Sequence, residues 1–289
     1  MNATTLLPLL HTRAHHDDSR RVALQTSGHT HGPITRLVSP GDLGEQIKPF
    51  IFLDHCRIRP GWGGMGMHPH SGIATLTWAI RGSIRYEDST GQSGVLPAGG
   101  VEWMRAGGGV WHGGGVAGHA PFEGFQLWVA LPPTLENGPA ESLYLAPDCI
   151  PTIGPAKLLL GSYGGAVSAI PPVAPMNYLG VTLEDGESWE YQPPPGHDVA
   201  WIAVNRGELQ VSDAIGPGWL AIFEEGEAPI RCKAVGRTEF VLGSALKHPH
   251  ELVLGSYSVH TNGDALRKGE ASIRRIGLAL ADAGKLKLR

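Results

Sequence analysis

The chain has 289 residues, of which 42% are hydrophobic and 17% are charged, so it is long enough for two domains that each bury a core. The net charge of −4 at pH 7, without a long run of Lys and Arg, argues against a protein that binds nucleic acid through general basicity. No apolar stretch is long enough to span a membrane, which argues against a membrane protein. The three cysteines are far apart and form neither a disulfide framework nor a zinc motif, which fits a cytoplasmic protein.

Short strands dominate the predicted elements of the first half. Glycine (41) and proline (23) are abundant among β-branched runs, and this composition favours turns and strands over helices. An apolar strand is expected at 49–54, and a loop at 59–64 leads into a strand that carries histidines. Further strands are expected at 73–80, 83–86, 94–96, 101–104, 110–112 and 125–131. Short strands with turns between them predict a sandwich or a barrel.

The second half begins after a connection at 132–156 in which proline is frequent. Another β-rich block follows, from residue 156 to about residue 259. From Asp264 to Leu288 the apolar residues recur with helical spacing, which predicts a terminal helix.

A weak internal repeat relates the two β-rich blocks. Arg81–Asp88 and Arg206–Asp213 both read Arg-Gly-x-aliphatic-x-x-x-Asp, and they are offset by 125 residues. A repeat on the scale of a domain indicates two barrels of the same kind. We therefore expect an all-β chain with two domains, a metal-binding barrel at 1–140 and a metal-free barrel with the terminal helix at 155–289.

Three histidines form the candidate functional site. His68 and His70 precede the apolar run at 73–80, and alternate side chains on a strand share a face, roughly 6.6 Å apart along it. His112 ends a second strand after the glycines at 107–109, which can form a tight turn towards the first pair. Three imidazoles can hold a transition-metal ion, so this pattern predicts a three-histidine metal centre. The alternative is that these are polar groups at a barrel mouth, hydrogen-bonded to each other and to the backbone.

Other histidine pairs carry weaker signals. His29-Thr30-His31 has no apolar strand after it, and His248-Pro249-His250 has no histidine at an equivalent distance further along the chain. The positions 125 residues after the three candidate ligands are Pro193, Pro195 and Arg237, none of which can replace an imidazole. Trp103 and Trp111 alternate with polar neighbours, so either could line a pocket beside the metal.

With these features in place, the sequence resembles the pirin family, whose members are bicupins of the cupin superfamily. The resemblance covers about residues 49 to 132 and rests on a series of motifs in order. They are Pro49-Phe50 with Leu53-Asp54, Met67-His68-Pro69-His70-Ser71-Gly72, Thr75-Leu76-Thr77-Trp78, Gly82 with Asp88-Ser89-x-Gly91, Trp103 to His112, and Gln126 to Pro132. Weaker matches in the second half are Gly243 to Pro249 and Thr261-Asn262.

The resemblance implies two tandem cupin-type β-barrels, a final helix, and an iron or similar ion in the first barrel. Pirins hold the metal with three histidines, which carry over to His68, His70 and His112, and with a glutamate two residues after the last histidine. That position is Gly114 in this chain. Imidazoles alone suit Fe, Ni, Cu or Zn, so the resemblance favours iron with the other three as alternatives. Glu102, His119 and Glu123 are the candidates to replace the missing carboxylate.

Three functions are compatible with this pattern. Some pirins resemble quercetin 2,3-dioxygenases, which implies a metal-dependent oxygenase acting on a small aromatic, flavonol-like substrate. Others have been described as metal- or redox-sensitive regulators that bind a protein partner. The third alternative is a degenerate cupin that holds no metal. In each case we expect a monomer.

Overall fold

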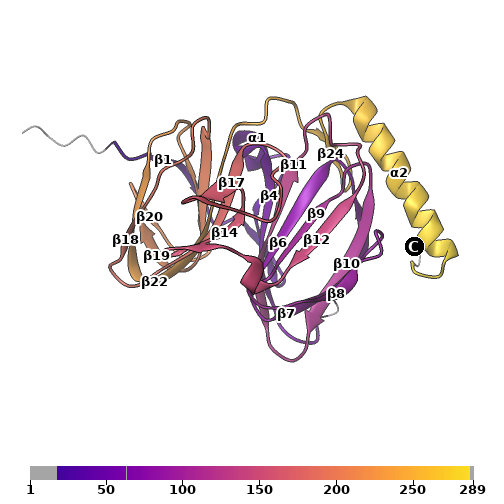
Figure 1. The fold of residues 1–289 in the computed structure, drawn as a ribbon, viewed down its shortest axis with the longest axis horizontal. Helices are drawn as coiled ribbons and strands as arrows, with labels where there is room; N and C mark the ends of the chain where they lie inside the picture. Colours follow the sequence, from indigo (N-terminus) through magenta and orange to yellow (C-terminus); the bar gives the residue numbers. More distant parts are fainter. Residues whose placement is uncertain (1–17, 63, 287–289) are drawn as a thin grey trace, which may run out of the picture.

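We describe a computed structural model of the chain at residues 18–62 and 64–286. The first barrel is built from two sheets (Figure 1). Its seven-stranded sheet has the order β12 (Glu141–Leu145), β9 (Val101–Arg105), β6 (Ile73–Arg81), β11 (Phe122–Ala130), β4 (Phe50–Ile58), β3 (Ile34–Val38) and β2 (His29–His31). Its four-stranded sheet has the order β5 (Met65–His70), β10 (Val110–Ala117), β7 (Ser83–Asp88) and β8 (Ser93–Leu96).

A nine-stranded sheet forms the second barrel. Its main path is β1 (Val22–Thr26), β21 (Leu220–Phe223), β19 (Val199–Gln210), β22 (Ile230–Ala245), β17 (Met176–Leu183), β14 (Ala156–Leu160) and β13 (Thr152–Ile153). The strands β18 (Ser188–Tyr191) and β20 (Ala214–Ile215) pair with β22 and β19. The remaining elements are two small hairpins and three helices: β15 (Ser162–Tyr163) with β16 (Ala166–Val167), β23 (Val253–Leu254) with β24 (Val259–His260), α1 (Leu43–Ile47), η1 (Pro147–Cys149) and α2 (Gly263–Asp282). The predicted tandem-barrel fold with a terminal helix is confirmed.

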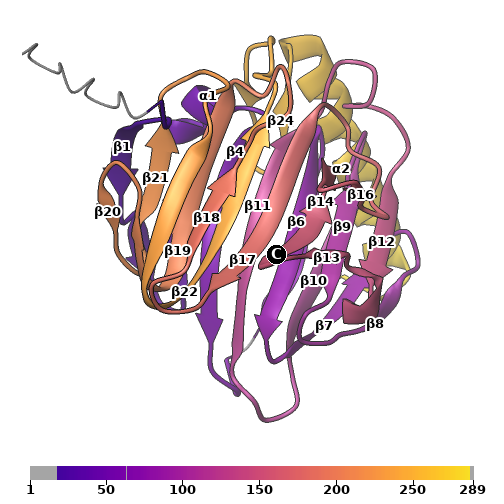
Figure 2. The same cartoon turned by 60° about the vertical axis from the view of Figure 1, so that its left-hand side comes forward.

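The largest hydrophobic core lies between the two barrels. The seven-stranded sheet and the sheet of the second barrel face each other (Figure 2). The first contributes Leu76 and Trp103 to this core, and the second contributes Tyr178 and Trp201. Alternation along β6 explains the arrangement, because residues 74, 76 and 78 face the second barrel while residues 75, 77 and 79 face the interior of the first. The strands of this sheet are therefore buried on both faces.

The two ends of the described chain cross between the barrels. β1 pairs with β21 and so completes the sheet of the second barrel, whereas α2 packs against β5 and β10 of the first barrel (Figure 1). The indole Nε1 of Trp111 donates a hydrogen bond to the carbonyl of Ile273 at 2.7 Å, which ties α2 to β10. The division of the chain into domains at 1–140 and 155–289 stays a prediction. In space, β1 from the first range belongs to the second barrel, and α2 from the second range packs on the first barrel.

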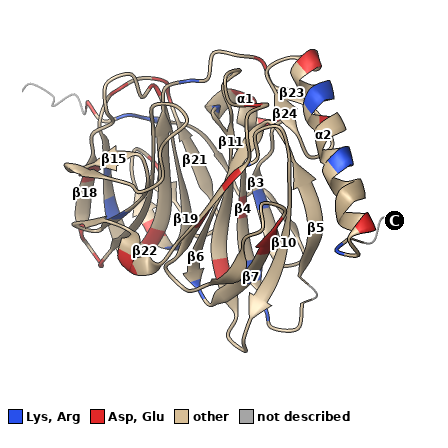
Figure 3. Ribbon diagram, turned by 45° about the vertical axis from the view of Figure 1, so that its right-hand side comes forward, with Lys and Arg blue, Asp and Glu red and all other residues tan. Residues whose placement is uncertain are grey.

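The terminal helix runs from Gly263 to Asp282, shorter than the predicted 264–288. Asn262 caps its first turn by accepting a hydrogen bond from Ala265 N–H. Gly284 follows with φ of 70°, a conformation that ends a helix readily, and residues 287–289 lie outside the described chain. Charges of both signs lie along α2 (Figure 3), and no helix in the described ranges is long and apolar enough to cross a membrane.

The internal repeat has a structural basis at its glycines. Gly82 separates β6 from β7 with φ of 71°, and Gly207 adopts φ of 73° where the pairing of β19 with β22 shifts register. A Cβ at Gly82 would collide with the carbonyl of Pro121, and one at Gly207 would collide with that of Arg237. Both positions therefore need glycine for the same turn of the strand.

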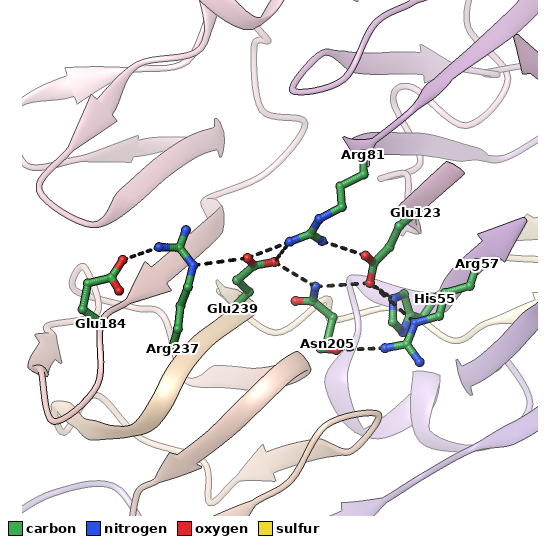
Figure 4. Close-up of polar contacts among 8 residues, drawn as sticks. All are labelled: His55, Arg57, Arg81, Glu123, Glu184, Asn205, Arg237 and Glu239. Atoms are coloured by element: carbon green, nitrogen blue, oxygen red, sulfur yellow. Dashed lines mark hydrogen bonds and ion pairs between the residues drawn. The ribbon is translucent and has the colours of Figure 1, made fainter. Parts of the chain in front are cut away.

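A polar network links the two barrels (Figure 4). Arg81 of the first barrel bonds to Glu239 of the second and to Glu123 beside it. Glu123 also accepts hydrogen bonds from His55 Nε2 at 3.0 Å and from Asn205 Nδ2 at 3.4 Å. These bonds join β4, β6 and β11 to β19 and β22 next to the apolar core.

Candidate metal centre

The three predicted histidines come together inside the first barrel. His68 and His70 lie two residues apart on β5 and point to the same side, and His112 of β10 pairs directly opposite His68 in the antiparallel ladder. Ring centroids are 4.5 Å apart for His68 and His112, 5.1 Å for His70 and His112, and 5.0 Å for His68 and His70. One nitrogen from each ring lies within 4.8 Å of the others. Among the described residues, these three histidines are the group of potential metal ligands whose ligand atoms lie this close together.

The Nδ1 atom of each ring faces an oxygen atom of the protein. His68 Nδ1–H donates to the carbonyl of Gly66 at 2.9 Å, and His70 Nδ1–H donates to the carbonyl of Tyr257 at 3.2 Å. His112 Nδ1 lies 3.6 Å from Oε1 of Glu102. A proton held on Nδ1 leaves the lone pair on Nε2, which is the form of imidazole that ligates a metal.

The Nε2 atoms provide the test of whether a metal fits. Nε2 of His70 and Nε2 of His112 are buried without a hydrogen-bond partner in the described chain. A buried polar nitrogen left alone is costly, whereas a coordinate bond would satisfy it. Hydrogen bonding between the histidines, the alternative considered above, does not occur among these rings, although backbone bonds to two Nδ1 atoms do. The residues present therefore fit a transition-metal ion.

Electrostatics agree with this assignment. Burial, and then the neighbouring His112, lower the pKa of His68 to about 4. Burial and the two other rings hold the pKa of His70 well below its usual value. Both rings are therefore neutral at pH 7, and a neutral ring binds a metal without first losing a proton.

Among the described residues, no carboxylate belongs to the group of converging ligand atoms. Gly114 cannot be replaced simply, because a Cβ there would collide with the carbonyl oxygen of Arg85 on β7. Of the three proposed replacements, His119 is exposed and Glu123 is engaged between the barrels. Glu102 is 4% exposed and faces the ring of His112, so it supports a ligand from behind.

A buried chain of side chains that the sequence did not reveal supports the loop after His70. Ser71 Oγ lies 3.0 Å from His260 Nε2, and His260 Nδ1 lies 3.2 Å from Oε2 of Glu136. Ser71 is fully buried, and Gly269 of α2 sits against this chain so closely that a Cβ there would collide with Ser71 and His260. With no access to solvent, this serine–histidine–glutamate chain holds β5 to the C-terminal part of the protein. No local sequence signal links residues 124 or more positions apart.

A cavity adjoins the histidines on the barrel interior. Its walls are mostly apolar side chains, with His68 and His112 at one side. The apolar part is made by Cys56, Ile58, Ile84, Val116 and Phe122. Trp62 lines this cavity, whereas Trp103 lies in the core between the barrels and Trp111 packs on α2. The expectation that Trp103 or Trp111 lines the pocket is wrong, because both point away from the interior.

The other histidine pairs gather no third ligand. His29 and His31 are exposed on β2. The rings of His248 and His250 lie 5.2 Å apart. Neither pair belongs to the converging group among the described residues.

The sequence of the chain is similar to those of known proteins. A family model described as Pirin matches residues 33–129, the part that carries all three histidines. A pirin-like protein of Caulobacter vibrioides is 30% identical over 272 residues, which cover 87% of this chain and 88% of that protein. A Pseudomonas aeruginosa protein named "Putative quercetin 2,3-dioxygenase" is 31% identical over 204 residues, 63% of this chain and 69% of that protein.

Solved structures share the fold. A quercetin 2,3-dioxygenase from Acinetobacter baumannii has a TM-score of 0.80 at 24% identity and covers 89% of this chain and 97% of its own. A bacterial pirin from Escherichia coli in complex with nickel(II) has a TM-score of 0.61 at 19% identity, with 79% of this chain and 98% of that chain covered.

Proposed function

Because this chain belongs to the pirin family, we propose that it binds one transition-metal ion through His68, His70 and His112 and is an oxygenase of the quercetin 2,3-dioxygenase type. Its substrates would be O2 and a small, flavonol-like aromatic compound. The observation that carries the proposal is the pair of buried, unpartnered Nε2 atoms of His70 and His112, the second of which lines a mostly apolar cavity together with His68. When bound, the ion would act as a Lewis acid for the hydroxyl and carbonyl oxygens of the substrate.

The residues of the chain would bind and orient the substrate. Apolar side chains on the cavity wall, such as Ile84 and Phe122, suit a planar aromatic ring and exclude water from it. Hydrogen bonds from Nδ1 hold the rings of His68 and His70, and Glu102 lies 3.6 Å from Nδ1 of His112, so the site is organised before a ligand enters. Glu102 places negative charge near the ion, where Gly114 offers none.

Imidazole ligands restrict the identity of the metal without fixing it. Nitrogen ligands suit Fe, Ni, Cu or Zn. We propose iron as the resident ion because it supports O2 chemistry, with nickel next because a bacterial pirin is known with nickel(II).

A second function, regulation through a protein partner, is favoured by the position of α2. This helix contacts both β5 and β10, the strands that carry the three histidines, and presents charges to solvent. A change in metal occupancy or redox state at the three histidines would therefore act directly on α2, which is exposed to solvent. In this alternative the protein is a monomer that binds a protein partner in a metal- or redox-dependent way and does not catalyse.

Metal content measured by plasma mass spectrometry tests the proposal. The parent and a His112→Ala variant would be purified without an affinity tag and, if empty, reconstituted with Fe(II), Ni(II) or Cu(II). We expect one equivalent of metal in the parent and a loss in the variant. O2 consumption with a flavonol would then separate the oxygenase from the regulator. Absence of metal from both proteins after reconstitution would instead support a degenerate cupin.

A further inference from the structure

A row of polar side chains crosses the inner wall of the first barrel. Glu102 of β9 pairs with Thr77 of β6, and Thr77 pairs with Gln126 of β11, so the three lie side by side on neighbouring strands. The three strands are adjacent in the seven-stranded sheet (Figure 1), and all three residues line the cavity. Residues that are directly opposite in a ladder share a face, so the side chains form a continuous polar strip.

The side chains of Thr77 and Glu102 make no hydrogen bond within the described chain. Thr77 is 7% exposed and its hydroxyl makes no hydrogen bond. Glu102 is buried, and Nδ1 of His112 lies 3.6 Å from its Oε1, beyond a hydrogen bond. The next residue in the same row, Asp54, lies outside the cavity and is bound by Arg36 through two bonds.

This contrast indicates a ligand. Buried polar groups in folded proteins are normally hydrogen-bonded, and each one without a partner needs an explanation. Within this row, Asp54 outside the cavity is satisfied by Arg36, whereas the hydroxyl of Thr77 inside the cavity has no partner in the described chain. The surrounding wall is apolar, so the strip would fix the orientation of an aromatic occupant through a few convergent polar contacts.

We propose that Glu102, Thr77 and Gln126 form a subsite that hydrogen-bonds the ring hydroxyl groups of a polyhydroxylated aromatic substrate while its chelating oxygens face the histidines. The subsite rests on the proposed function, because it assumes that the cavity takes the substrate of the metal centre. Glu102 accepts hydrogen bonds only, Gln126 donates and accepts, and Thr77 does either. An occupant must therefore supply hydroxyl donors, which selects a polyphenol over a plain aromatic ring.

Thr77→Val provides the cleanest test because valine keeps the shape and removes an unpartnered hydroxyl. Thr75→Val is its matched control: Thr75 lies two residues away on the same face of β6, is fully buried, and also has an unpartnered hydroxyl, but it does not line the cavity. Thermal unfolding would check that both variants fold.

Binding would be measured without O2 on the nickel-loaded protein. The probes are quercetin, which carries several ring hydroxyls, and 3-hydroxyflavone, which has the chelating oxygens alone; quenching of tryptophan fluorescence gives Kd. For quercetin we expect Thr77→Val to raise Kd roughly fivefold to tenfold, the effect of one hydrogen bond. For 3-hydroxyflavone the change should stay below about twofold. Thr75→Val should leave both constants unchanged.

Several results would overturn the subsite. They are equal binding of the two probes by the parent, no binding of either, equal weakening of both probes by Thr77→Val, no effect of Thr77→Val, or the same effect from Thr75→Val. Failure of the proposed function has a different signature. If quercetin binds as expected and the iron-loaded protein consumes no O2 with quercetin in air, the oxygenase proposal fails and the subsite stands.

Discussion

Replacing Glu123 with glutamine should make the stability of the protein less dependent on pH. The side chain of Glu123 is 19% exposed and accepts hydrogen bonds from His55, Arg81 and Asn205 at the contact between the barrels (Figure 4). Burial alone would raise the pKa of Glu123, but the hydrogen bond from His55 and the charge of Arg81 outweigh it and lower the pKa from 4.5 to about 2.

The magnitude follows from this difference. A shift from 4.5 to about 2 corresponds to about 3 kcal/mol at 1.36 kcal/mol per unit, and screening at Arg81, which is 42% exposed, reduces the expected value to about 2 kcal/mol. Because the pKa is lower in the folded protein than in the unfolded chain, this stability is fully present above about pH 5 and is lost as the pH falls towards 2.

Urea unfolding monitored by tryptophan fluorescence would measure the effect at pH 7 and near pH 3. At pH 7 the free energy of unfolding of Glu123→Gln should be about 2 kcal/mol lower than that of the parent. The difference between the two proteins should be smaller near pH 3. Glu190→Gln is the control, since Glu190 is 52% exposed where it pairs with Arg231, and it should change stability by less than about 1 kcal/mol. A difference between parent and Glu123→Gln that is the same at both pH values would refute the reasoning.

Three further predictions concern the metal centre and the helix beside it. Glu102→Gln, which removes the charge facing His112, should weaken metal binding roughly 10- to 100-fold in a titration with a competing chelator; unchanged affinity would contradict the supporting role. Gly114→Glu should not add a ligand, because its Cβ would collide with the carbonyl of Arg85, and we expect a lower melting temperature without tighter metal binding. Gly269→Leu should unseat α2, whose position allows no Cβ there, and protease digestion should then cut the C-terminal segment faster than in the parent.

Much of the metal centre could be predicted because its information is local. The alternation of a strand places His68 and His70 on one face, and the glycines before β10 allow a turn that brings His112 opposite them. The terminal helix could also be predicted from its spacing, although its end at Asp282 depends on the chain after it. Periodicity over a few residues was sufficient for each of these features.

The parts that escaped prediction depend on contacts between distant residues. Tyr257 holds His70 through a backbone carbonyl, which any residue could supply. The sequence named Glu102 as a candidate replacement for the missing carboxylate. Its position 3.6 Å from His112 depends on the register of β9 in the seven-stranded sheet and on the way β10 of the other sheet packs against β9. Trp103 and Trp111 were misassigned because alternation tells which residues share a face and not which face is the interior.

The crossing of the chain ends means that neither barrel is a separable unit. A cut in the connection after β12 would give one fragment with β1 but without β21, and another with α2 but without β5 and β10. Each fragment alone would expose an unpaired sheet edge or an apolar helix face, which favours aggregation, whereas the two together could reassemble. Deleting the second barrel would therefore leave β1 without its partner β21, and removing the C-terminal segment with it would take α2 from β5 and β10, the strands that carry the three histidines.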